Sequence, residues 1–139
     1  MKERRVALTP TLQLWRYFTR HDRISAQQQL ATTAIGLLRA WVASVGTVLF
    51  GTDLGAVDYD PSEEYALMAE AGMSFRQILA ALTTAPAERF GESKQLGRIA
   101  TGFQADLVIL KEDPFKNIRA LAAVQYTLRA GKIIYRASE

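Results

Sequence analysis

The chain has 139 residues, about half of them apolar, which suits one ordinary domain with a real core and excludes wholesale disorder. It has no cysteine and one histidine, so this chain alone cannot build a disulfide framework, a cysteine nucleophile or a metal site with several histidines. The net charge of +3 comes from scattered basic residues without a groove-reading motif, so nucleic acid is not expected as a partner. A membrane is not expected either, because no apolar run approaches the ~20 residues of a span.

The first predicted element is a short buried strand over residues 6–12, VALTPTL, which Pro10 ends or confines to an edge. Residues 15–24 mix aromatic and basic side chains without a clean period. We therefore expect a loop there, with at most one helical turn.

A helix is predicted next. Ser25 and Gln28 have the spacing of a capping box, in which each side chain bonds the other residue's backbone N–H. Apolar residues then recur at three- and four-residue steps from Leu30 to Val45, which indicates one buried stripe. Gly46 is the expected stop.

A second strand is predicted over residues 47–50, followed by a helix. Asp60 is the expected cap of this helix, Pro61 its first residue and Glu63 the second half of a capping box. Gly72 is expected to end it.

Two further helical segments follow. Ser74 and Gln77 repeat the capping-box signature and lead into an apolar stripe that reaches Leu82. Residues 86–90 form a short last turn that begins at a proline, and Gly91 closes it.

The pattern then changes from helical to β. Residues 105–110, ADLVIL, are typical of a strand, and Asp113-Pro114 marks a turn. Residues 124–136 indicate two strands joined at Ala130-Gly131 as a hairpin. The whole order predicts an α/β fold with a boundary near Lys94, parallel before it and a small β segment after it.

Asp53 is the candidate site residue, because it follows the predicted strand 47–50 within Gly51-Thr52-Asp53. In parallel α/β folds, ligands sit beyond the carboxyl ends of the strands, where a carboxylate can bind a divalent cation or take a proton from its water. Ordinary turn chemistry explains an aspartate here as well. The spacing alone leaves both explanations open.

Five stretches of the sequence form a recognisable set of motifs: GLLRAWVASVGTVLFGTDLG, EYALMAEAGMSFRQILAALTTAPAERFG, LGRIATGFQADLVIL, EDPF and AGKIIYR. Together they resemble the C-terminal part of a metal-dependent amidohydrolase. The similarity runs from about Val6 to Arg136 and is nearest to imidazolonepropionase-like enzymes and Xaa-Pro dipeptidases.

This resemblance implies a partial (β/α)8 barrel followed by part of a small β-sandwich. Residues 1–94 would hold the last two strand–helix units, with strand seven at residues 8–12, and residues 95–139 the C-terminal sandwich strands. By resemblance, Asp53 contacts the metal, expected to be zinc, and shuttles the proton of the attacking water. The parent enzyme would hydrolyse a C–N bond in a small molecule, either a cyclic amide or an Xaa-Pro dipeptide.

The departures from the family pattern matter as much as the similarity. A (β/α)8 barrel needs ~250 residues, whereas this chain offers two of the eight strands. The family's His-x-His pair and its further histidines have no counterpart, and His21 is interpreted as a surface residue in a basic loop. We therefore expect a fragment that is inactive and binds no metal by itself. A non-catalytic assembly module and one subunit of a split enzyme are the alternatives.

Three further expectations follow. Exposed strand edges favour association into a homo-oligomer. The aromatic residues Trp15, Tyr17 and Phe18, and the nearby Thr9 and Thr11, could contact substrate, although packing explains them equally well. The sequence does not establish the compartment, and the cytoplasm is only a default.

Overall fold

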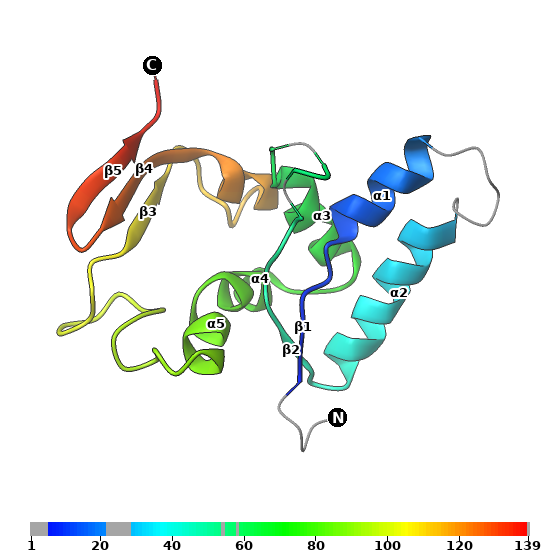
Figure 1. Cartoon of the computed structure of the whole chain (residues 1–139), viewed down its shortest axis with the longest axis horizontal. Coiled ribbons are helices and arrows are strands. Elements are labelled where there is room, and N and C mark those ends of the chain that lie inside the picture. The colour runs from blue at the N-terminus through cyan, green and yellow to red at the C-terminus, as the bar shows by residue number, and fades with distance from the viewer. Residues whose placement is uncertain (1–5, 22–28, 54, 58, 139) are drawn as a thin grey trace.

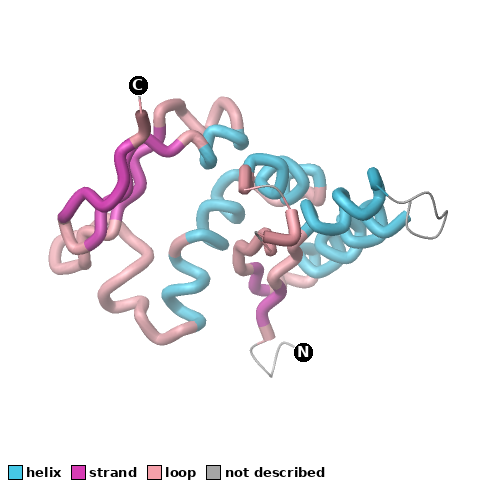
Figure 2. Tube along the Cα trace, turned by 45° about the horizontal axis from the view of Figure 1, so that its top comes forward, coloured by secondary structure: helices cyan, strands magenta, loops and turns pink. Residues whose placement is uncertain are grey.

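The computed structural model describes residues 6–21, 29–53, 55–57 and 59–138. These residues form a mixed α/β structure in which a parallel pair of strands and a three-stranded antiparallel sheet lie apart, with helices between them (Figures 1 and 2). Within these ranges, no helix has both the length and the apolar character needed to cross a bilayer.

The parallel pair consists of β1 (Ala7–Leu8) and β2 (Thr47–Val48), with Ala7 opposite Thr47 and Leu8 opposite Val48. One more hydrogen bond continues the pairing, from the Leu49 N–H to the Leu8 carbonyl at 2.9 Å. Both strands are shorter than predicted. Beyond β1, Pro10 cannot donate to a ladder and Thr11 has a φ of 46°, so the chain turns away.

The prediction of a loop over residues 15–24 is wrong for residues 15–21, because α1 spans Leu12–His21. Residues 22–24 lie outside the described residues. Leu12 was also predicted to belong to the first strand, yet it opens this helix and is almost fully buried. The helical period was hidden because the buried face carries Gln13, a polar residue that hydrogen-bonds across to the next layer. The side chain of His21 lies outside the described residues.

The next helix, α2, spans Leu30–Ala43, which confirms the predicted helix. The predicted buried stripe is confirmed only in part, because Leu37 and Val45 are exposed. The buried residues of α2 are Ala31, Ile35 and Leu38. The capping box expected at residues 25–28 lies outside the described residues. At the other end of α2, Val45 and not Gly46 takes the left-handed conformation, with φ of 60°. Gly46 has a different role: a Cβ there would lie 2.3 Å from Trp41 Cε2, so only glycine fits beneath the indole.

Three helices follow β2: α3 (Ser62–Glu70), α4 (Phe75–Leu82) and α5 (Thr84–Arg89). The capping box at the start of α4 is confirmed, with the Gln77 side chain accepting from the Ser74 N–H at 2.8 Å. The box predicted for α3 forms only in part. Asp60 accepts from the Ser62 N–H at 2.9 Å, but Glu63 forms an ion pair with Arg20 instead.

One hydrophobic core joins the helices to the parallel pair. Its buried members come from α1, α2, β2, α3, α4, the residues next to them and the 3-10 helix η3 (Ile118–Ala122): Leu12, Ile35, Leu38, Val48, Tyr65, Leu67, Met68, Ala71, Met73, Ile78, Ala81 and Leu121. Burying one large aliphatic side chain contributes about 1.5–3 kcal/mol. The two short strands are therefore stabilised mainly by the helices that cover them.

The C-terminal sheet has the order β3-β4-β5, formed by β3 (Leu107–Leu110), β4 (Val124–Arg129) and β5 (Lys132–Arg136). The predicted strand and hairpin are confirmed. Ala130 and Gly131 both have positive φ, as a two-residue hairpin turn requires. The connection η3 (Ile118–Ala122) was not predicted.

Candidate functional site

The candidate site lies where the parallel strands end. Because β1 and β2 run in the same direction, the turns that follow them leave the same edge of the sheet. Thr9 and Gly51 bring these two turns into contact: a Cβ on Gly51 would lie 2.4 Å from Thr9 Cγ2. Gly51 does not have a positive φ, so it is required for close approach and not for backbone freedom.

Asp53 lies in the second turn, beyond the end of β2, which agrees with its predicted position after the strand. It is exposed, whereas the preceding Thr52 is buried. Its φ of 58° is in the left-handed region, which aspartate tolerates better than most residues, and its carbonyl accepts from the Ala56 N–H at 3.1 Å. The backbone thus turns at Asp53 and leaves this residue open to solvent.

The described residues do not assemble a metal site by themselves. Across residues 6–21, 29–53, 55–57 and 59–138, no group of three or more His, Cys, Asp or Glu side chains could hold a metal ion. Asp53 supplies one carboxylate, and a divalent transition metal in a hydrolase needs several ligands. The chemistry of the donor set therefore does not fit a resident metal held by these residues alone.

Glu64 is a second acidic residue near the turns, and sequence reasoning missed it. It is 0% exposed, although it lies in the first turn of α3, where acidic residues are common at the surface. Its Oε1 accepts from the Leu12 N–H at 2.9 Å, and its Oε2 accepts from the Gln13 N–H at 2.6 Å. Nothing in its sequence spacing distinguishes it from the partly exposed Glu63 beside it.

Burial raises the pKa of the Glu64 carboxyl. The backbone N–H groups of Gln13 and Leu12 oppose that shift because they favour the charged form, and the nearby Glu63 adds to it. A buried carboxylate is stable only with such donors. Glu64 therefore takes the place of a local cap for α1, although it comes from α3, more than fifty residues away.

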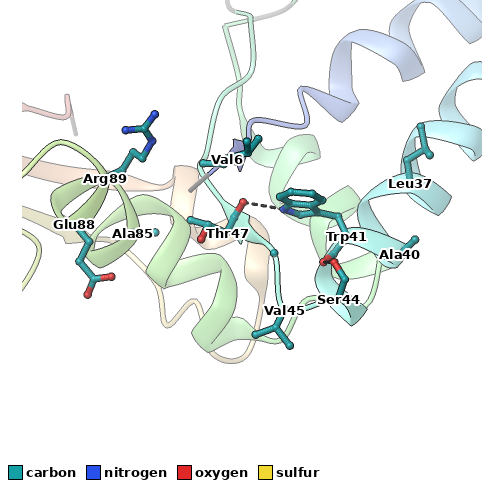
Figure 3. Close-up of a pocket in the computed structure, with 12 residues that line it drawn as sticks. Val6, Leu37, Ala40, Trp41, Ser44, Val45, Thr47, Ala85, Glu88 and Arg89 are labelled. Carbon is teal, nitrogen blue, oxygen red and sulfur yellow. Dashed lines mark hydrogen bonds between the residues drawn. The ribbon is translucent and has the colours of Figure 1, made fainter. Parts of the chain in front are cut away.

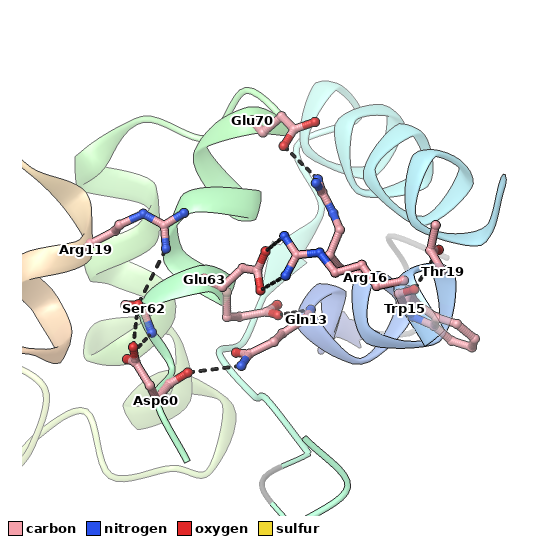
Figure 4. A network of polar contacts seen from close by, with 11 residues as sticks. Gln13, Trp15, Arg16, Thr19, Asp60, Ser62, Glu63, Glu70 and Arg119 are labelled. Carbon is pink, nitrogen blue, oxygen red and sulfur yellow. Dashed lines mark hydrogen bonds and ion pairs between the residues drawn. The ribbon is translucent and has the colours of Figure 1, made fainter. Parts of the chain in front are cut away.

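Further polar contacts join α1 to both ends of α3 and to the residues just before it (Figure 4). The Gln13 side-chain amide donates to the Asp60 carbonyl at 3.0 Å, Arg20 pairs with Glu63 at 2.9 Å, and Arg16 pairs with Glu70 at 3.0 Å. Exposed ion pairs of this kind contribute ~0–1 kcal/mol each. The buried Glu64 contacts and the Gln13 bond are therefore the specific part of this interface.

Phe50 and Tyr65 link the second turn to α3. Their rings stack with centroids 4.8 Å apart. Burial raises the pKa of the Tyr65 phenol to about 12, with further contributions from Asp60 and Glu64. The neutral phenol thus belongs to the packed wall beneath the β2 turn.

Two hollows lie between α2 and the β1 region, and Leu37 lines both. The larger, about 840 Å³, is lined by Val6, Trp41 and Val45 among others, at the end of the strands opposite Asp53 (Figure 3). The smaller, about 340 Å³, includes Trp15 and the Thr9–Thr11 turn. The larger hollow is therefore not the candidate site, and Trp15 is the aromatic residue of α1 that lies beside the turns.

Comparison with known proteins identifies relatives over nearly the whole chain. A model described as "Amidohydrolase family" matches residues 4–135. A 43-residue stretch is 44% identical to the amidohydrolase tasK of Hapsidospora irregularis, covering 31% of this chain and 4% of that protein.

Solved structures match the fold. A Xaa-Pro dipeptidase with bound methionine superposes with a TM-score of 0.88 at 22% identity, covering 99% of this chain and 36% of that one. A prolidase complexed with N-methylphosphonate-L-proline has a TM-score of 0.71 at 25% identity, covering 95% and 35%. The chain thus spans little more than a third of the length of these structures.

Proposed function

The chain belongs to the amidohydrolase family, and on that basis we propose that it is the C-terminal part of a hydrolase that cleaves C–N bonds other than ordinary peptide bonds. Residues 1–94 would be the last two strand–helix units of a (β/α)8 barrel, and residues 95–139 would be sandwich strands. The parallel pairing of β1 with β2 across two intervening helices supports the first assignment. The separate antiparallel sheet supports the second.

Asp53 is the residue we assign to the chemistry. The observation that carries this assignment is its exposed position at the carboxyl edge of the parallel pair, in a turn that the Thr9–Gly51 contact holds close to the neighbouring one. A solvent-accessible carboxylate at that edge can accept the proton of an attacking water as a general base.

Members of the amidohydrolase superfamily generally use divalent metals, and zinc is the metal we propose for the complete enzyme. Since the described residues do not form a metal site, the other ligands would come from outside them. For the same reason, we propose that the 139-residue chain alone does not hydrolyse substrate.

The proposed substrate is an Xaa-Pro dipeptide. Both solved relatives described above are named for this activity, one as a Xaa-Pro dipeptidase and one as a prolidase. These names favour the dipeptide over a cyclic amide. The hollow beside Trp15 would offer an apolar surface to a compact substrate side chain.

We also propose that the chain associates with a partner through its open surfaces. Every residue of β5 is exposed, and so are the large apolar side chains of Leu37 and Val45. A row of unpaired strand groups beside apolar surface favours pairing with another chain. Sedimentation of the isolated chain should show an oligomer, and a monomer at high concentration would contradict this part.

The test of the proposed function begins with the coding frame upstream of these 139 residues. A His-x-His pair in the same frame supports a continuous enzyme, whereas a separate neighbouring barrel gene supports a split one. The complete protein or the two-chain complex is then assayed on Xaa-Pro dipeptides. Asp53→Asn should lower kcat by roughly 10²–10⁴, and the control Glu63→Gln should leave it unchanged. Hydrolysis that is unaffected by Asp53→Asn would refute the assignment.

A further inference from the structure

We propose that Glu64 is a positioning residue: its carboxylate holds the β1 turn, residues 9–11, against the β2 turn that carries Asp53. The significance of this arrangement for catalysis rests on the proposed function. The arrangement itself rests on two contacts, one from Glu64 to the start of α1 and one from Thr9 to Gly51. The chain joins them directly, because the Thr9–Thr11 turn leads into Leu12, the first residue of α1.

The start of α1 lacks a usual N-cap residue. A usual N-cap residue has an extended backbone, and its side chain accepts from the second or third N–H of the helix. Thr11 precedes the helix but has a φ of 46°, an unfavourable conformation for a β-branched residue. Glu64 supplies the acceptor instead, since both of its carboxylate oxygens bond the first two N–H groups of α1.

The support that Glu64 gives to α1 comes from the helix after the neighbouring turn. Glu64 lies on α3, which follows the β2 turn, whereas Leu12 and Gln13 open the helix that follows the β1 turn. The carboxylate therefore ties together the two helices that leave the same edge of the parallel pair. A strained residue such as Thr11 persists only where its surroundings hold it, and the buried Glu64 contacts provide that constraint.

The Thr9–Thr11 turn touches the turn that carries Asp53. The methyl group of Thr9 occupies the space where any side chain at position 51 would begin. Because the fit is this close, a shift of the Thr9–Thr11 turn changes the contact with Gly51, two residues before Asp53.

The electrostatic surroundings favour a response to proton uptake. On the α3 side, Glu63 and the Tyr65 phenol are titratable neighbours of Glu64, and Asp60, just before the helix, acts on the same phenol. From α1, Arg16 and Arg20 face this interface, where they pair with Glu70 and Glu63. From η3, Arg119 contacts the Ser62 hydroxyl, at 3.5 Å. Protonation of Glu64 removes the charge that its two backbone donors stabilise, so the start of α1 should loosen when it occurs.

The direct test is an NMR titration of the 139-residue chain without metal. The Glu64 side-chain carboxyl, the Leu12 and Gln13 amide protons, the Thr9 methyl and the Gly51 amide should share one midpoint. That midpoint should lie above the ordinary glutamate value of 4.5, because burial raises the pKa. If the Thr9 methyl and the Gly51 amide do not follow Glu64, the proposal is wrong.

Two variants sharpen the test. Glu64→Gln should abolish the shared transition, whereas the neighbouring control Glu63→Gln should keep it. Thr11→Gly accepts the positive φ without strain, so Glu64→Gln should reduce the folding equilibrium constant by a smaller factor in that background than in the parent chain. Equal factors in the two backgrounds would overturn the proposal, even if Glu64→Gln alone folds poorly.

These measurements are independent of hydrolysis. A titration that fails leaves the assignment of Asp53 intact, and an Asp53→Asn variant that keeps full activity leaves the coupling through Glu64 intact.

Discussion

The parallel pair and the C-terminal sheet are held together in different ways. β1 and β2 have two residues each, and the residues that pair between the two strands are more than thirty positions apart in sequence. β4 and β5 are longer and are joined by a two-residue turn; β4 is mostly half-buried and β5 is exposed throughout. The hairpin therefore depends on local interactions, whereas the parallel pair exists because helices and buried polar contacts hold it. Changes in the core should damage the first region far more than the second.

The largest effect on stability is expected from Met68→Ala, since Met68 of α3 is 0% exposed and belongs to the hydrophobic core. Loss of such a side chain should cost about 2–5 kcal/mol of unfolding free energy, measured by urea denaturation. The matched control is Val108→Ala on the exposed β3, which should change stability by about 0.5 kcal/mol or less. Equal losses would mean that the two regions do not differ as described.

A smaller effect is expected from Gly51→Ala. The new methyl would meet Thr9 Cγ2, which should cost about 1–3 kcal/mol, as overpacking does. Thr9→Ser removes that methyl, so the double variant should recover most of the loss. If Thr9→Ser brings no recovery, the contact between the two turns is not the cause.

The C-terminal sheet has its own local constraint, the bond from the Ala130 N–H to Asp106 Oδ1 at 2.7 Å. Asp106→Ala should cost about 1–2 kcal/mol, because it removes a charged acceptor from the hairpin turn. Hydrogen exchange should accelerate in β4 and β5 and remain unchanged in α3. Faster exchange that spreads to the core helices would show that the hairpin is not a local unit.

The smallest effect is expected from Tyr65 and appears only in alkali. Its folded-state pKa of about 12 lies above the ordinary value of 10, so its contribution to stability is complete below pH 10 and is lost as the pH rises toward 12. By pH 11 the loss should reach roughly 1 kcal/mol. Tyr65→Phe should remove this pH dependence in denaturation experiments, whereas Tyr135→Phe on the exposed β5 should not.

Local sequence signals predicted the elements that local forces stabilise. The Ser74–Gln77 capping box, the helix α2 and the Ala130-Gly131 hairpin all have short-range signatures, and the structure confirms them. α1 was missed because its buried face includes Gln13, whose partner Asp60 is far away in sequence. A periodicity of apolar residues cannot reveal a buried polar contact of that kind.

The candidate site divides in the same way. The sequence by itself determined that Asp53 follows a strand that ends in a glycine turn, and it carried the motifs of the amidohydrolase family. Only the tertiary structure decided that Thr9 packs against Gly51, that Thr11 is strained and that Glu64 is buried beneath α1. The reason is physical: a turn depends on its nearest neighbours, whereas the burial of a carboxylate depends on which distant backbone donors the fold brings to it.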